Sequence, residues 1–167
     1  FSGFCPGNFA AVTGWLGTLL APTTAAMEVK LHVYDLSMGL ARTMSMSMLG
    51  KQLDGIWHTG IVVYGREWFF GGGVQSAPPG RTPYGMPTKS VSLGHTHIPE
   101  DVLQEFLEEI SPRFTFETYN VLYNNCNNFS NEIAVFLTGG EIPKYILDLP
   151  KEALNTPIGP MIENLLS

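Results

Sequence analysis

The chain has 167 residues, 44% of them hydrophobic and 14% charged, which is the composition of one folded domain with a core of ordinary size. A net charge of -6 and a pI near 5.1 argue against a nucleic-acid partner, because such proteins need a basic face. The two cysteines, Cys5 and Cys126, cannot form a disulfide framework, so we expect a reducing compartment: the cytoplasm, with the nucleus as a second location.

Residues 1–26 differ from the rest of the chain because they contain no charged side chain. Their apolar run, residues 9–20, is interrupted by Thr and Gly, whereas a membrane span needs roughly 20 consecutive apolar residues. No basic residues precede this run, as they would in a secretory signal. We therefore expect an extra N-terminal segment over 1–26, no stable membrane span, and a domain over 27–167 with a helical tail from about residue 142.

The domain is predicted to begin with a strand and a helix. Apolar and polar residues nearly alternate over residues 29–36, which is typical of a half-buried strand. The Met- and Ser-rich residues 43–53 then predict a short helix with Met44 and Met48 on one face. Gly55 is expected to end this helix.

A hairpin and a long loop follow. Residues 57–64 and 67–70 are rich in β-branched and aromatic residues and predict two strands joined by a tight turn. Residues 71–87 contain many Gly and Pro and predict a loop, of a length that is more often functional than idle in a compact domain. A further short strand is expected over residues 90–93.

The second half of the domain is predicted to be mainly helical. Residues 99–110 start with Pro and acids and carry apolar residues at helical spacing, which indicates an amphipathic helix. Residues 119–123 predict a brief strand that leads into a helix over 126–138, and Gly139 ends that helix. Two short helices punctuated by Pro are expected in residues 142–166.

Cys126 is the first residue of the predicted 126–138 helix, a position at which a cysteine can become a nucleophile. Unpaired backbone N–H groups and the helix dipole at this end favour a thiolate, which is the nucleophilic form of cysteine. His58, far upstream at the start of a predicted strand, could act as its base. Both residues also have a structural interpretation. Cys126 shares its helical face with apolar residues, as an inert core cysteine would, and His58 alternates with other strand residues, as a structural histidine would.

Several ordered motifs in residues 27–167 closely resemble the desumoylating isopeptidases of the PPPDE superfamily. The motifs are Val33-Tyr34-Asp35-Leu36-Ser37, Gly39-Leu40-Ala41, Leu49-Gly50-Lys51-Gln52-Leu53, Gly55-Ile56-Trp57-His58-Thr59, Tyr119-Asn120, Asn125-Cys126-Asn127 and Phe136-Leu137-Thr138-Gly139. The resemblance implies an α+β protein with a permuted papain-like fold, in which a small antiparallel sheet packs against helices and the histidine precedes the cysteine. Carried over to this chain, it makes Cys126 the nucleophile and His58 its partner.

The residues that would support this pair are less well determined by the sequence. Asn125, Asn127 and Asp35 are candidates for orienting the imidazole or stabilising an oxyanion, and helix capping or solvation is the alternative for the asparagines. Candidates for lining the cleft are Trp57, Gly72 and Gly73. His32 is expected to be a structural strand histidine, and the four histidines do not form a metal ligand set, so neither a metal nor another cofactor is expected.

The resemblance implies removal of SUMO or ubiquitin from lysine side chains through an acyl-enzyme, and it also implies a homodimer. The partner would therefore be a SUMO- or ubiquitin-conjugated protein. Two alternatives stay open. The same Cys/His pair could hydrolyse a protein S-acyl thioester, as a depalmitoylase does, or the chain could be a non-catalytic adaptor.

Overall fold

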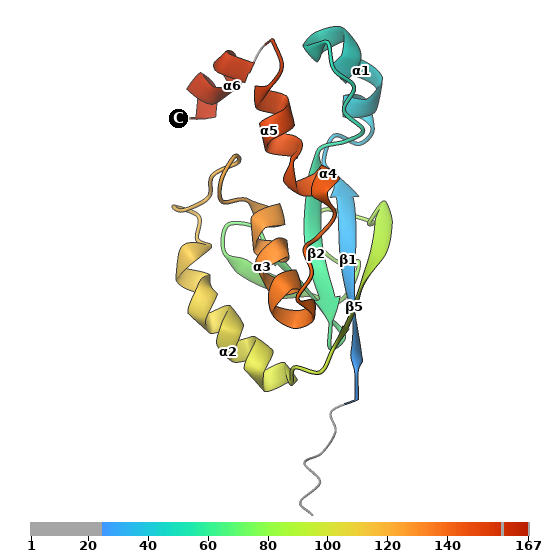
Figure 1. The fold of residues 1–167 in the computed structure, drawn as a ribbon, viewed down its shortest axis with the longest axis vertical. Coiled ribbons are helices and arrows are strands. Elements are labelled where there is room, and N and C mark those ends of the chain that lie inside the picture. The colour runs from blue at the N-terminus through green and yellow to red at the C-terminus, as the bar shows by residue number, and fades with distance from the viewer. Residues whose placement is uncertain (1–24, 158, 167) are drawn as a thin grey trace, which may run out of the picture.

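An antiparallel sheet organises the fold (Figure 1), which the computed structural model describes for residues 25–157 and 159–166. Five strands form the sheet in the order β4-β3-β2-β1-β5. The strands are β1 (Met27–Asp35), β2 (Trp57–Val63), β3 (Arg66–Phe70), β4 (Val74–Ala77) and β5 (Lys89–Thr96). Sheet and helices together confirm the predicted α+β class. Residues 1–24 of the predicted extra N-terminal segment lie outside the described residues.

Helices cover one face of the sheet and one of its ends. They are α1 (Leu40–Leu49), α2 (Glu100–Ile110), the 3-10 helix η1 (Ser111–Arg113), α3 (Cys126–Thr138), α4 (Lys144–Leu147), α5 (Leu149–Leu154) and α6 (Gly159–Leu166). Helix α3 lies on the sheet with α2 outside it, while α1, α5 and α6 gather at the opposite end from α2 (Figure 1). Within residues 25–157 and 159–166, none of the helices combines the length and the apolar character needed to cross a bilayer.

The hydrophobic core fills the space between the sheet and α3. Alternate residues of β1 and β2 point into it, as the period of a half-buried strand requires. Aromatic rings close the core beneath α3: Phe129 meets Phe114 edge to face at 5.1 Å between ring centroids, and Phe70 meets Phe114 at 5.3 Å. This packing holds α3 on the sheet, and hydrogen bonds between Thr59 and both Asn127 and Ser130 fix the start of the helix relative to β2.

The hairpin and the two longer helices agree with the sequence-based predictions. Strands β2 and β3 pair through Ile61↔Trp68 and Val63↔Arg66, and both turn residues between them have positive φ. Helix α3 ends at Gly139, whose φ of 72° is left-handed and suits glycine. Helix α2 begins after Pro99 and buries its apolar face, as its residue spacing indicates.

The prediction for α1 is wrong in its bounds and in its buried face. The helix starts at Leu40 and is terminated by Gly50, whose φ is 67°, rather than by Gly55. Met44 and Met48 are exposed, and the buried residue of the helix is Ser45, which accepts a hydrogen bond from the Leu53 N–H at 2.8 Å. Polar contact with the following loop, rather than an apolar stripe, therefore holds α1 in place.

Three smaller predictions also need correction. Residues 119–123 form no strand; a single bridge pairs Asn120 with Asn124, and turns fill the space between them. The predicted loop over 71–87 contains strand β4, because Gly71 and Gly73 make a tight turn that returns the chain to β3. The tail has three short helices rather than two, since the chain turns again after Leu147 and after Leu154.

Candidate active site

The start of α3 is built by its N-cap residue. Asn125 has extended backbone angles, and its side-chain oxygen accepts hydrogen bonds from the N–H groups of Asn127 at 2.8 Å and Asn128 at 3.1 Å. Asn128 returns a bond to the Asn125 N–H at 2.9 Å, which completes a capping box. The Asn125 amide nitrogen donates to Val121. Asn125 is therefore the helix cap, which was the alternative to a role in catalysis, and it fixes Cys126 as the first helical residue.

Asn127 ties this helix end to β2 on both sides of His58. Its amide nitrogen donates to the Trp57 carbonyl at 3.0 Å, and its oxygen accepts from the Thr59 hydroxyl at 2.9 Å. One helical turn later, the Ser130 hydroxyl donates to the Thr59 carbonyl at 3.2 Å. The amide of Asn127 thus holds the strand that carries the candidate histidine rather than the imidazole itself.

Cys126 is a free thiol with 6% of its surface exposed. Its sulfur donates to the Asn127 side-chain oxygen at 3.8 Å. Burial raises the pKa of the Cys126 thiol to about 11, although the backbone N–H groups of Thr59, Asn127 and Cys126 act in the opposite direction. The expectation that the helix end makes Cys126 a ready thiolate is therefore wrong for this closed arrangement, because loss of hydration outweighs the N–H groups.

His58 lies on the sheet face opposite α3, inside an aromatic cage. Its ring lies against that of Tyr84, with centroids 3.6 Å apart and planes tilted by 31°, and Tyr34 and Phe69 contact it at 5.8 and 6.1 Å. Burial lowers the pKa of His58 to about 4, so the imidazole is neutral at pH 7. Its Nε2 atom is buried and has no hydrogen-bond partner among the described residues, which is uncommon for a buried nitrogen.

Thr59 and Tyr84 link the two candidate residues at the edge of β2. The pairing of β2 with β3 stops at Ile61↔Trp68. The Thr59 N–H lies beyond this last pair, next to His58 in the chain, and it faces the Cys126 sulfur. Tyr84 covers His58, and burial, followed by the negative charge of an ionised Cys126, raises the pKa of its hydroxyl. Tyr84 therefore contacts the His58 ring and lies close enough to Cys126 to respond to its charge. We refer to the region around Cys126, His58 and Tyr84 as the crevice.

Sequence reasoning missed Tyr84. It singled out the loop over residues 71–87 as functional but had no reason to choose this tyrosine, because the loop has no periodicity that predicts where its side chains point. Pro83-Tyr84-Gly85 is the only signal, since an aromatic residue between turn residues often packs back onto the fold.

Asp35 does not orient the imidazole. Its carboxylate accepts hydrogen bonds from the N–H groups of Ser37 at 3.0 Å, Gly39 at 2.8 Å and Ile56 at 3.1 Å. These bonds lower the pKa of Asp35 against the opposing effect of burial, which is the largest single influence on it. Asp35 therefore builds the turn between β1 and α1, and it is the strand neighbour of Trp57, not of His58.

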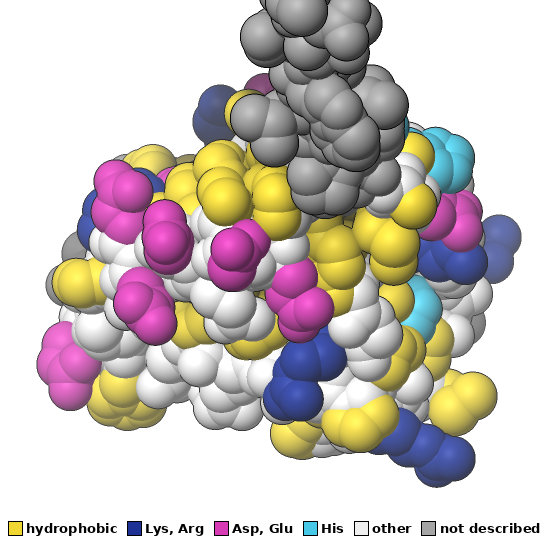
Figure 2. Space-filling view, turned by 90° about the horizontal axis from the view of Figure 1, so that it is seen from below, with side chains coloured by type: hydrophobic (Ala, Val, Ile, Leu, Met, Phe, Trp, Pro, Cys, Tyr) yellow, Lys and Arg dark blue, Asp and Glu magenta, His cyan; other side chains and the backbone are white. Residues whose placement is uncertain are grey.

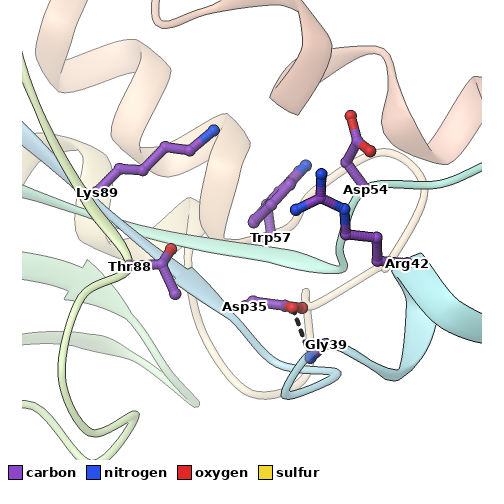
Figure 3. A pocket seen from close by; sticks show the side chains of 7 residues that line it. All are labelled: Asp35, Gly39, Arg42, Asp54, Trp57, Thr88 and Lys89. Atoms are coloured by element: carbon purple, nitrogen blue, oxygen red, sulfur yellow. Dashed lines mark hydrogen bonds between the residues drawn. The ribbon is translucent and has the colours of Figure 1, made fainter.

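The predicted cleft residues fall on two sides of Cys126. Gly72 and Gly73 both have positive φ, and a Cβ on neighbouring Gly71 would stand 2.8 Å from the Tyr84 hydroxyl oxygen, so the chain passes very close to the crevice. Trp57 lines a pocket of about 310 Å³ on the other side of β2 (Figure 3). The described residues contain no group of three or more His, Cys, Asp or Glu side chains placed to hold a metal ion.

Comparison with known proteins identifies the family. Residues 27–166 match the model described as "PPPDE putative peptidase domain". The chain belongs to the PPPDE peptidase family. Over 140 residues it is 54% identical to Desumoylating isopeptidase 1 of Homo sapiens and 49% identical to that of Xenopus laevis, with 83% of each chain covered. It is 32% identical to DeSI-like protein sdu1 of Schizosaccharomyces pombe, covering 78% of this chain and 68% of that protein.

Membership in the PPPDE peptidase family agrees with the resemblance seen in the sequence motifs, and it confirms the prediction of a cysteine-type isopeptidase, which is a hydrolase. Within this PPPDE domain, the only cysteine of the matched residues is Cys126. The roles of the individual site residues remain predictions, and they enter the proposal below.

Proposed function

We propose that this chain hydrolyses the isopeptide bond between SUMO and a lysine side chain, with Cys126 as nucleophile and His58 as general acid and base. The observation that carries the proposal is the buried, unpartnered Nε2 of His58 beside the crevice of the sole cysteine in the domain. A buried acceptor without a partner is expected where a proton is to be received. The similarity to Desumoylating isopeptidase 1 supports SUMO as the modifier, and ubiquitin is the alternative.

The first half of the reaction starts from a protonated thiol and a neutral imidazole. These are the forms favoured at pH 7 by a Cys126 pKa of about 11 and a His58 pKa of about 4. When the Cys126 sulfur attacks the isopeptide carbonyl, His58 takes the thiol proton. The resulting imidazolium gives this proton to the lysine nitrogen as the C–N bond breaks, which leaves a thioester on Cys126 and a free lysine.

The oxyanion formed in this step needs donors that already point at it. The backbone N–H groups of Cys126 and Thr59 lie close to the sulfur, and they belong to a helix and a strand that Asn127 clamps together. Loss of one such donor typically costs about 3 kcal/mol of transition-state stabilisation. In the second half, His58 removes a proton from water, which hydrolyses the thioester and releases the modifier with a free carboxyl terminus.

The crevice favours an extended, small-residue chain. Cys126 is almost covered, and Gly71 approaches the Tyr84 hydroxyl too closely to accept a side chain. A diglycine tail, the end of SUMO and ubiquitin, has no side chains and suits such a passage. The pocket beside Trp57 is lined by charged groups and therefore does not resemble the apolar channel that a thioesterase needs for an acyl chain.

The test compares three substrates on one enzyme: SUMO and ubiquitin, each linked through an isopeptide bond to a lysine peptide, and a fluorogenic acyl thioester. We expect the SUMO conjugate to be cleaved fastest and all turnover to disappear in Cys126→Ser, with the unfolding midpoint unchanged. Trapping of a SUMO thioester on Cys126 in rapid acid quench would support the acyl-enzyme. Turnover that survives Cys126→Ser, or faster cleavage of the acyl thioester, would contradict the proposal.

A further inference from the structure

A pocket lies at the end of the sheet where β2 begins. The pocket of about 310 Å³ is floored by Trp57, and Arg42 of α1 and Lys89 of β5 extend toward it from opposite sides in Figure 3. This volume suits one or two amino-acid side chains rather than a large cofactor. Nothing in the hydrolysis of the isopeptide bond uses these two cations.

The pocket lining carries two basic and two acidic side chains, in a chain whose net charge is -6. Arg42 and Lys89 form no ion pair with another described residue. The Lys89 ammonium instead lies over two rings, 5.5 Å from the centroid of Trp57 and 5.3 Å from that of Tyr145. The two acids in the lining are Asp35, whose carboxylate accepts hydrogen bonds from three backbone N–H groups, and Asp54, so the formal charges of the lining balance.

The acidic charge of the molecule is concentrated elsewhere. Helix α2 exposes Glu100, Asp101, Glu105, Glu108 and Glu109. Figure 2 shows acidic side chains gathered on this side of the molecule. The pocket is lined by Gly39 and Arg42 at the start of α1, and α1 lies at the opposite end of the molecule from α2 (Figure 1). An anionic group is therefore repelled more strongly on the α2 side than at the pocket, where Arg42 and Lys89 have no ion-pair partner among the described residues.

The glycine turn and the Lys89 side of the pocket lie on opposite sides of strand β2. Gly71–Gly73 follow β3 and lie toward one edge of the sheet, whereas Lys89 begins β5 at the other edge, with β2 between them. The floor residue Trp57 directly precedes His58, and its carbonyl is held by Asn127 of the Cys126 helix. If the modifier tail enters along the glycines, the lysine side of the bond points toward the pocket.

We propose that Arg42 and Lys89 bind a carboxylate side chain of the polypeptide whose lysine carries the modifier, next to that lysine. This inference rests on the proposed isopeptidase function and deepens it by naming a substrate feature. The Arg42 guanidinium matches a carboxylate with two parallel donors, and Lys89 adds a second charge held over Trp57. An acidic residue beside the lysine thus increases the rate of cleavage.

The test uses two SUMO–lysine peptides that differ in one residue, Glu or Gln, two positions from the modified lysine. For the wild-type enzyme we expect kcat/KM to be about fivefold higher with the Glu peptide at low ionic strength and the difference to shrink in salt, as for partly exposed ion pairs. In Arg42→Gln/Lys89→Gln the preference should vanish. Arg42→Lys/Lys89→Arg, which keeps both charges, should retain part of it.

Two controls separate this inference from its alternatives. Arg66→Gln and Lys30→Gln remove the same charges at sites away from the pocket and should keep the fivefold preference. SUMO linked to a small fluorophore has no acidic peptide, so the double variant should cleave it like wild type. Equal loss on the fluorophore substrate would mean that the carboxylate comes from the modifier and would overturn the proposal, as would an unchanged Glu preference.

Failure of the proposed function gives a different result. In that case no SUMO substrate is cleaved by the wild-type enzyme, and a SUMO tail ending in a vinyl sulfone does not label Cys126. Failure of the pocket inference leaves both labelling and cleavage intact and removes only the dependence on the acidic residue.

Discussion

Strand β2 has an apolar face toward α3 and a polar, aromatic face toward the loop of residues 78–87. On the first face, Ile61 and Val63 are buried in the continuous core. On the second, His58 is enclosed by rings, and a Cβ on Gly60 would stand 2.6 Å from the Glu67 carboxyl group. The two faces differ in what they bury. The α3 face is mainly apolar, with polar contacts of Thr59 to Asn127 and Ser130 near Cys126, whereas the other face buries the titratable side chains of His58 and Glu67.

Glu67 organises the polar face. Its carboxyl group is fully buried and accepts hydrogen bonds from the Tyr34 hydroxyl at 2.7 Å and the Gly80 N–H at 2.7 Å. His32 contacts it through Nδ1 at 2.9 Å, which agrees with the structural role predicted for this histidine. Because Gly80 belongs to the loop that carries Tyr84, the network fastens this loop over His58.

The contrast separates stability from chemistry. Burial of apolar side chains on the α3 face is favourable, whereas burial of polar groups on the other face is costly unless each finds a partner. Glu67 and His32 have partners, and His58 Nε2 has none among the described residues. The Thr82 hydroxyl oxygen is also buried without a partner among the described residues, but only the imidazole nitrogen is a base near neutral pH, so we expect chemistry at His58. Four predictions test the division between the two faces.

The largest effect is expected from His58→Gln. The amide cannot take the thiol proton, so we expect kcat/KM on the SUMO–lysine peptide to fall about 10³-fold. His32→Gln is the matched control, because it changes a histidine on the same face that contacts Glu67 instead of the crevice. Equal losses in the two variants would assign His58 a structural role.

On the apolar face, Phe129→Ala should mainly affect folding. Phe129 is fully buried and packs edge to face on Phe114, so its truncation is expected to lower the free energy of unfolding by about 3–5 kcal/mol, measured in urea. Val135→Ala, on the exposed side of the same helix, should cost less than about 1 kcal/mol. Similar losses at both positions would mean that α3 does not pack on the sheet as described.

A pH dependence of stability should follow from the burial of His58. Its pKa falls from the ordinary 6.5 to about 4, so between these values the unfolded chain binds a proton that the folded chain does not. The corresponding stability is fully present above pH 6.5 and is lost as the pH falls toward 4, by about 3 kcal/mol. Urea unfolding of wild type and His58→Gln at pH 7 and pH 4 isolates this contribution, which the variant should lack.

The smallest effect is expected from Tyr84→Ala. Without the ring, water reaches His58 and its pKa moves back toward 6.5, which should shift the acid limb of the kcat/KM profile upward from about pH 4. We expect a loss of about tenfold in kcat/KM at pH 7, because the imidazole is no longer held by stacking. Tyr84→Phe keeps the ring and should retain the wild-type profile. A profile unchanged in Tyr84→Ala would show that the stack does not influence the imidazole.

Elements with strong local signals were predictable from the sequence. The β2–β3 hairpin follows from alternating residues and a glycine turn, and α3 follows from the Asn125 cap and the Gly139 end. The position of Cys126 at a helix start was therefore available before any coordinates. The bounds of α1 were not, because Ser45 holds this helix through a contact with Leu53 that no periodicity reveals.

The electrostatics of the site could not be read from the sequence. Spacing places Cys126 near helix N–H groups, but the pKa of the thiol depends on how completely the surrounding elements exclude water. Tyr84 reaches His58 only because Glu67, from another strand, holds Gly80 of its loop. Both facts depend on contacts between residues far apart in the chain.

The enclosed thiol of Cys126 also bears on how the resting enzyme meets oxidants. Hydrogen peroxide reacts with thiolates, and a group with a pKa of about 11 and 6% exposure offers it little thiolate and little access. Sulfenic acid should therefore form slowly on Cys126 in the absence of substrate. The same shielding should slow the loss of activity when the protein is exposed to peroxide.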